Sequence, residues 1–219
     1  RQSVDDGFTR FGDLREGDRG QLAKERGLDR NDFTLAMSTS WLKSQYASKT
    51  LMSGVGEMRS TDFEFGFGGW NMSHFTRRMD EGFGSQGSLT GEDRNNFAGG
   101  VVKMFNPDGK PTNNDLGGVN QAGIDRDGLR VAGAFGDFKT MWNRVTVDNK
   151  SGTLRFNEFA VSRGKSNLSF SSQSATDGFS GTRNLMESEQ KKYGTIDGLN
   201  KTNWNFNTPI GANGKFDFE

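Results

Sequence analysis

Few side chains in this sequence have the types and spacing that acid–base chemistry needs. His74 is the only histidine among 219 residues, so any Ser–His–Asp triad would have to use it. Asp62 and Glu64 are close enough in sequence to act as the paired carboxylates of a glycoside hydrolase. A lone histidine on a predicted helix is more often a packing or surface residue, and 28 acidic residues produce such pairs by chance. The sequence favours a protein that is not an enzyme and keeps a glycan- or phosphate-acting hydrolase as an alternative.

Oxygen-bearing side chains gather in the second half of the stretch Phe135–Phe159. The first half of this stretch has apolar residues at helical spacing, namely Phe135, Phe138, Met141, Trp142 and Val145. The second half, from Asp148 to Phe159, predicts a loop that turns at Gly152 and runs into another helix. The pattern therefore predicts a helix, a loop and a second helix.

This pattern resembles the EF-hand family of calmodulin-like calcium-binding proteins. In that family, oxygen ligands alternate along a twelve-residue loop, the sixth residue is glycine and the twelfth is a bidentate glutamate. With Glu158 in the twelfth place, Gly152 falls in the sixth, while the first place holds Val147 and Asp148 comes one residue late. The resemblance implies calcium as the cofactor, bound by the side chains of Asp148, Asn149, Ser151 and Glu158 and by the backbone carbonyl of Thr153.

A short repeat extends the resemblance along the chain. Gly27–Phe33, Gly91–Phe97 and Gly198–Trp204 share a glycine, an Asp or Asn two residues later, a basic residue next and an aromatic residue at the end, and Gly123–Leu129 is a weaker copy. The resemblance then implies a mostly α fold of repeated helix–loop–helix units with short β bridges between their loops. The expected organisation is a helical region 1–165 with units near 3–46, 70–105, 106–134 and 135–163, a Gly/Ser-rich linker 166–184, and a further, truncated unit over 185–219.

Aromatic residues carry much of the apolar content. Hydrophobic residues make up only 31% of the chain, yet it holds 19 Phe and 4 Trp. We expect the tryptophans Trp41, Trp70, Trp142 and Trp204 to anchor the core. Phe63, Phe65 and Phe67 alternate with polar or small residues, which predicts a short strand or an extended aromatic loop.

Charge and composition exclude several classes of protein. Basic and acidic residues number 28 each, and without a basic stripe we expect no nucleic-acid partner. No apolar run reaches the roughly 18 residues of a membrane-spanning helix, so we expect no membrane span, and the chain shows no secretory signal peptide. The absence of cysteine excludes disulfides and thiolate chemistry and does not settle the compartment.

The function implied by the resemblance is that of a calcium-binding or calcium-stabilised interaction or scaffold protein with a protein partner. The alternative is a secreted, cysteine-free bacterial interaction protein or effector whose helical fold needs no metal. Such a protein would be distinguished by a neutral, apolar surface.

Overall fold

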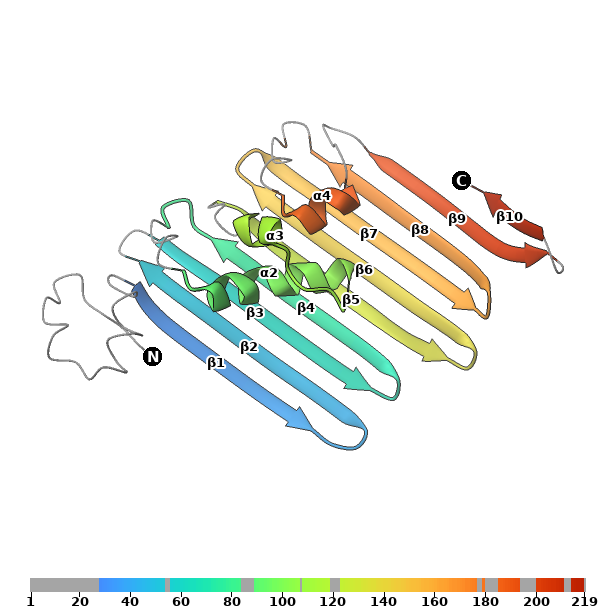
Figure 1. Ribbon diagram of the computed structural model, residues 1–219, viewed down its shortest axis with the longest axis horizontal. Coiled ribbons are helices and arrows are strands. Elements are labelled where there is room, and N and C mark those ends of the chain that lie inside the picture. Colours follow the sequence, from blue (N-terminus) through green and yellow to red (C-terminus); the bar gives the residue numbers. More distant parts are fainter. Residues whose placement is uncertain are drawn as a thin grey trace, which may run out of the picture.

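The described residues form one ten-stranded antiparallel sheet in which every strand pairs with its neighbours in sequence (Figure 1). The computed structural model describes residues 28–53, 56–83, 89–106, 108–118, 123–176, 179, 185–193, 200–210 and 214–218. The strands are β1 (Leu28–Ser38), β2 (Leu42–Ser53), β3 (Gly56–Phe67), β4 (Trp70–Met79), β5 (Asp125–Phe135), β6 (Phe138–Asn149), β7 (Gly152–Arg163), β8 (Ser166–Ala175), β9 (Lys201–Ile210) and β10 (Gly214–Phe218).

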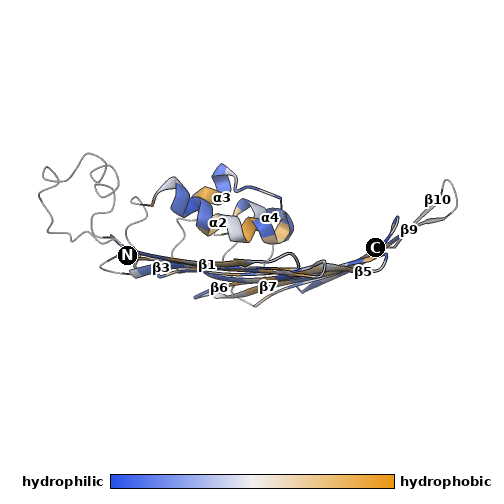
Figure 2. Cartoon of the chain, turned by 90° about the horizontal axis from the view of Figure 1, so that it is seen from below, coloured by the Kyte–Doolittle hydropathy of each residue, from blue (hydrophilic) through white to orange (hydrophobic). Residues whose placement is uncertain are grey.

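Three helices in the described part of the chain lie on one face of the sheet, between strands in sequence. They are α2 (Gly91–Phe105) and α3 (Asn113–Gly118), which follow β4, and α4 (Glu187–Tyr193), which follows β8. In the edge-on view these helices all lie on the same side, and no described element lies against the opposite face (Figure 2). We call the two sides the helix face and the uncovered face.

The two ends of the strands differ in their connections. At one end the strands join through tight turns, and Gly68, Gly69, Gly136 and Gly164 in these turns have φ between 55° and 84°, which glycine adopts without strain. The helical insertions leave from the other end, after β4 and β8, and cover only that half of the helix face (Figure 1).

The core lies between the helices and the covered half of the sheet. Alternate strand residues point to opposite faces, so one residue in two can reach the helices. From the strands the core takes side chains such as Leu51, Met58, Phe75, Val145 and Leu154, all at most 3% exposed. The helices contribute the fully buried Val101 and Ala98 of α2 and Tyr193 of α4.

The sheet contains a tandem repeat of four strands followed by a helix. The bounds of β2, β3 and β4 recur at one constant spacing in β6, β7 and β8, so that Leu42 corresponds to Phe138, Gly56 to Gly152 and Trp70 to Ser166. The start of α2 at Gly91 corresponds to that of α4 at Glu187 at the same spacing. We call the two copies unit 1 (β1–β4 with α2) and unit 2 (β5–β8 with α4).

The predicted mostly α fold of EF-hand-like helix–loop–helix units is wrong. The predicted unit 135–163 is the β6–β7 hairpin, and unit 70–105 combines β4 with α2. The described part of 3–46 contains β1 and the start of β2, and 106–134 contains α3 and most of β5. The predicted linker 166–184 includes β8, and 185–219 includes α4, β9 and β10. Residues 1–27 lie outside the described residues.

Two predictions about aromatic residues have opposite outcomes. The period of two at Phe63, Phe65 and Phe67 is confirmed as a strand, β3. The tryptophans do not anchor the core, because Trp41, Trp70, Trp142 and Trp204 are between 39% and 62% exposed.

Candidate functional site: an apolar band on the uncovered face

The uncovered face carries every large hydrophobic side chain that is exposed in the described part of the chain. Antiparallel register and two-residue alternation assign fourteen of them to this face: Phe33, Leu35, Met37, Tyr46, Phe65, Phe67, Trp70, Phe135, Phe138, Trp142, Phe159, Leu168, Trp204 and Phe206. The remaining one, Trp41 in the β1–β2 turn, packs edge-on against Phe67 with ring centroids 5.8 Å apart.

Two adjacent rows of directly paired residues cross the whole face without a charged side chain. The first row runs from β1 to β9 through Met37, Ser44, Phe65, Met72, Val131, Trp142, Phe159, Phe170 and Trp204. The second row, one step nearer the tight turns, runs from β2 to β9 through Leu42, Phe67, Trp70, Gly133, Thr140, Val161, Leu168 and Phe206, with Trp70 and Gly133 lying just beyond the last β4–β5 pair, Asn71 and Ala132. We call these two rows, with the aromatic residues of the adjoining turns, the apolar band.

Aromatic contacts fill the band from strand to strand. Phe170 and Trp204 lie with ring centroids 4.6 Å apart. The ring of Trp70 lies over Gly133, where a Cβ atom would collide with the indole, so the glycine makes room for it. At the tight-turn margin, the guanidinium of Arg163 lies 5.1 Å from the ring centroid of Phe138. A cation over an aromatic face is stabilised by the ring quadrupole.

Charged residues of the uncovered face concentrate beyond the band, toward the end of the strands where the helical insertions leave. There, Arg78 pairs with Asp125 at 3.0 Å and Arg59 pairs with Glu57 at 2.8 Å. Between this zone and the band, His74 Nε2 lies 2.9 Å from Asp127 Oδ2. The uncovered face therefore changes from charged to apolar along the strands.

The helix face is polar at the level of the first apolar row. On that side of the sheet, the row one residue nearer the helices than the first apolar row contains Gln45, Glu64, Ser73, Arg130, Asn143, Glu158, Ser171 and Asn203 in direct pairing order. Two adjoining cavities of about 480 and 590 Å³ open there, and both are lined by Gln45, Glu64 and Lys103. The sheet is thus amphipathic across its thickness along the first apolar row.

Ion pairs fasten the helices to the helix face. In unit 1, Arg30 and Lys49 pair with Asp93 of α2 at 2.6 and 2.8 Å. Burial acts to raise the pKa of Asp93, but hydrogen bonds from Lys49, Arg30 and Thr90 outweigh it and lower the pKa to about 2. In unit 2, Arg126 pairs with Glu189 of α4 at 2.8 Å, and both side chains are at most 1% exposed.

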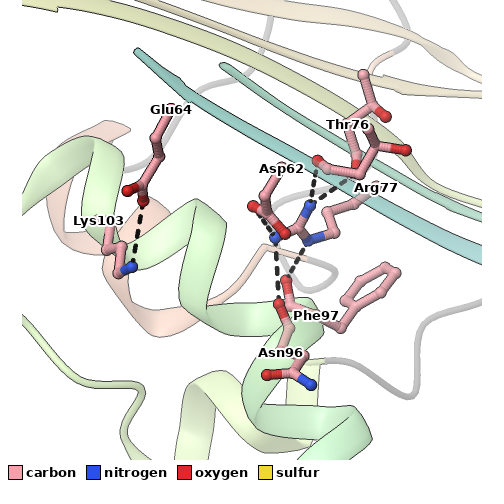
Figure 3. A network of polar contacts seen from close by, with 8 residues as sticks. Asp62, Glu64, Thr76, Arg77, Asn96, Phe97 and Lys103 are labelled. Carbon is pink, nitrogen blue, oxygen red and sulfur yellow. Dashed lines mark hydrogen bonds and ion pairs between the residues drawn. The ribbon is translucent and has the colours of Figure 1, made fainter. Parts of the chain in front are cut away.

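Arg77 makes a second attachment of α2 (Figure 3). Its guanidinium donates to the carbonyl oxygens of Phe97 at 2.6 Å and Asn96 at 3.1 Å, and to Asp62 at 2.6 Å. Burial lowers the pKa of Arg77, and the Asp62 carboxylate opposes that shift. Because Gly100 has no side chain, the guanidinium can lie directly against the helix at that residue.

The residues considered for acid–base chemistry are engaged in these contacts. Asp62 binds Arg77, and Glu64 lies 3.5 Å from Lys103 (Figure 3). His74 is on a strand, β4, and not on a helix, and it faces the side opposite Asp62. The arrangement favours structural roles for Asp62 and Glu64.

The structure does not bring the predicted calcium ligands together. Asn149 Oδ1 accepts hydrogen bonds from the backbone N–H groups of Ser151 and Gly152, which closes the β6–β7 turn. Asp148 accepts a hydrogen bond from the Thr153 hydroxyl on the uncovered face, whereas Glu158 pairs with Lys192 at 3.0 Å on the helix face. Asp148 and Glu158 lie on opposite faces of the sheet, and the described residues contain no group of three or more His, Cys, Asp or Glu suited to a metal ion. The EF-hand and helix–loop–helix assignments are therefore wrong, and calcium binding by these residues stays an untested prediction.

Comparison with known proteins finds no match among protein-family models, curated proteins or solved structures. Among the helices of the described residues, none combines the length and the apolar character needed to cross a membrane.

Sequence reasoning missed the apolar band, although a signal for it was present. Phe33, Leu35 and Met37 alternate with polar or small residues as strictly as Phe63, Phe65 and Phe67 do. Direct comparison of these stretches would have indicated strands with one apolar face.

Proposed function

We propose that this protein binds lipid bilayers and that its apolar band contacts their hydrocarbon. One observation carries the proposal: the exposed large hydrophobic side chains of the described residues all lie on the face that no described helix covers. A partner is needed because soluble monomers rarely expose a contiguous apolar patch larger than a few hundred Å².

The size of the band supports a large apolar partner. With ~200 Å² per aromatic side chain, the band exposes on the order of 1,000 Å². Transfer of that area out of water is worth on the order of 25 kcal/mol before any opposing cost. Along β5, the face is apolar from Leu129 to Phe135, which is about 20 Å at ~3.3 Å per residue. This height fits within the roughly 30 Å of a bilayer hydrocarbon core.

The chemistry of the band favours lipid over a protein partner. Protein interfaces carry about one hydrogen bond per 100–200 Å² and a polar rim. The two apolar rows offer few hydrogen-bonding groups beyond the Ser44 and Thr140 hydroxyls and the indole N–H groups of their tryptophans. Tryptophan at the margin of an apolar surface is also typical of membrane interfaces, and Trp41 and Trp70 lie at the tight turns.

The test uses the tryptophans, because Trp41, Trp70, Trp142 and Trp204 are the only four in the chain. Each lies in or beside the band, so tryptophan fluorescence, excited selectively over the two tyrosines, reports on this surface alone. We expect the emission to shift to shorter wavelength when vesicles of zwitterionic phosphatidylcholine are added, and the protein to float with the vesicles in a density gradient. An unchanged emission spectrum together with protein that stays at the bottom of the gradient would overturn the proposal.

A protein interaction through the same face is the second candidate. The uncovered apolar surface is the feature expected of the alternative interaction protein, although the helical fold expected for it is wrong. Equilibrium sedimentation without lipid separates the two candidates: a defined dimer whose tryptophans stay shielded when vesicles are added would favour the interaction protein.

A further inference from the structure

The two units correspond in their contacts as well as in their strand bounds. The ion pairs that hold the helices, Arg30–Asp93 and Arg126–Glu189, each join residues 63 positions apart. Both pairs link the start of the first strand of a unit to the helix that ends it. The two units therefore repeat the contacts between strand and helix as well as the strand bounds.

The connection after the fourth strand also recurs bond by bond. In unit 1, the Asp80 N–H donates to the Glu57 carbonyl at 2.9 Å and the Phe83 N–H donates to the Asp80 carbonyl at 3.0 Å. In unit 2, the Thr176 N–H donates to the Thr153 carbonyl at 3.0 Å and the Phe179 N–H donates to the Thr176 carbonyl at 3.0 Å. Phe83 and Phe179 are both buried in the core.

A third copy begins at β9. The sequences Gly27-Leu-Asp-Arg, Gly123-Ile-Asp-Arg and Gly198-Leu-Asn-Lys precede or open β1, β5 and β9. Lys201 therefore occupies the place of Arg30 and Arg126. The first strands of three successive copies are thus β1, β5 and β9.

The junctions between copies use one register. At the first junction, between β4 and β5, Asn71 lies opposite Ala132. At the second, between β8 and β9, Asn167 lies opposite Asn207. Asn71 and Asn167 are equivalent positions of the fourth strand, and Ala132 and Asn207 are equivalent positions of the first strand. Each first strand therefore receives the preceding fourth strand in the same alignment.

Among the strands that the structure describes, none pairs with the edge of β1 that faces away from β2, which is the edge where β5 and β9 receive a fourth strand. β1 is 11 residues long, and its residues from Asn31 to Ser38 are exposed. It contains no proline, so every residue from Asn31 to Ser38 has a backbone N–H that can take part in a ladder. Ala36 is the β1 position equivalent to Ala132 and Asn207.

We propose that the open edge of β1 binds a strand of the fourth-strand type from a further copy of this unit. The strand pairs antiparallel, with the asparagine equivalent to Asn71 and Asn167 opposite Ala36. Backbone hydrogen bonds supply the attraction, and alternation aligns the apolar side of the incoming strand with the apolar band. The proposal rests on the repeat and does not depend on lipid binding.

The test is disulfide trapping. Because the chain contains no cysteine, only the introduced cysteines can form a disulfide. The probe is a synthetic peptide with the sequence Trp70–Met79 that carries Asn71→Cys. It is mixed, without lipid, with the full chain carrying Ala36→Cys, Thr34→Cys or Ser38→Cys. All three chain positions lie on the same side of an exposed edge strand, and circular dichroism checks that each variant keeps its strand content.

The expected result is a disulfide that forms at least about tenfold faster with Ala36→Cys than with the other two variants, because only directly opposite residues have Cα atoms within disulfide range. A control peptide with the sequence Phe138–Asn149 and Met141→Cys, which copies a second strand, should show no such preference. Equal rates at the three positions, equal trapping of the control peptide, or no trapping at all would overturn the proposal.

Discussion

The substitution Phe159→Lys tests the lipid-facing role of the band at its centre. Phe159 lies between Trp142 and Phe170 in the first apolar row and is 41% exposed. A lysine on a lipid-facing strand position costs about 2–4 kcal/mol near the bilayer midplane. Since about 1.4 kcal/mol is a factor of ten, we expect vesicle binding to weaken by about 30-fold to 1,000-fold.

The matched control is Ala160→Lys, the next residue along β7. Ala160 points to the helix face, beyond the part that the helices cover, so its lysine reaches water and should leave vesicle binding within about twofold, since surface substitutions stay within about 0.5 kcal/mol. Phe159→Lys in water loses only cross-strand contacts worth about 1 kcal/mol, so both variants should fold. The assay is co-flotation over a series of phosphatidylcholine concentrations. Equal binding of Phe159→Lys and the unmodified chain would refute the reasoning, as would an equal loss in the two lysine variants.

Four further predictions concern the attachment of the helices and the calcium hypothesis. Gly100→Ala should destabilise the protein by about 1–3 kcal/mol in urea unfolding, because a Cβ atom there collides with Arg77. Gly99→Ala, where the Cβ atom lies in open space, should be neutral or stabilising by up to about 1 kcal/mol. The idea fails if the two alanine variants behave alike. Glu189→Gln should cost about 3–5 kcal/mol, because it removes the negative charge that lies 2.8 Å from the buried Arg126 guanidinium, and a loss below 1 kcal/mol would show that the pair is dispensable. The folded-state pKa of Asp93, about 2, is below its ordinary value of 3.8, so the stability that its ionised carboxylate contributes is complete above pH 4 and disappears as the pH falls through 2. In Asp93→Asn, the stability should no longer fall with pH over this range by the amount that Asp93 contributes. An unchanged pH dependence of unfolding would contradict the assignment. Excess calcium should leave the melting temperature unchanged, because the predicted ligands lie on both faces of the sheet, and a clear rise relative to chelator would instead support calcium binding.

The β3 stretch shows what the sequence could predict. Phe63, Phe65 and Phe67 lie on one face of a strand whose other face carries Asp62 and Glu64, and this clean alternation made the period visible. An amphipathic strand in an antiparallel sheet is a local pattern. The alternation of apolar and polar residues could be recognised without knowledge of any partner strand.

The β6 stretch shows why the helical prediction failed. Met141 and Val145 point to the helix face while Phe138 and Trp142 point to the uncovered face, and both faces are apolar there. Two interleaved apolar sets imitate the spacing of a helix, so the period alone could not separate strand from helix. The asparagine and glycine of the following loop close a hairpin, and the EF-hand resemblance used the same residue types in another geometry.

The contacts that join distant segments could not be predicted. His74 and Asp127 meet across β4 and β5 although 53 residues separate them, and their pairing depends on the register of the whole sheet. The apolar band likewise exists only because nine strands, β1 to β9, align their alternation. A repeat signature was visible in the sequence at Gly27 and Gly123. That it marks the start of equivalent strands became clear only from the pairing of the strands in the sheet.

The most direct test of the account is the quenching of tryptophan fluorescence by lipids with brominated acyl chains. The indoles of the chain lie in or beside the apolar band, and the helix face carries none among the described residues. If the apolar band contacts lipid, bromines placed within the acyl chains should quench the fluorescence strongly, and the membrane should protect it from a water-soluble quencher. Fluorescence that acyl-chain bromines leave unchanged while the water-soluble quencher remains fully effective would contradict the proposal that this face contacts lipid.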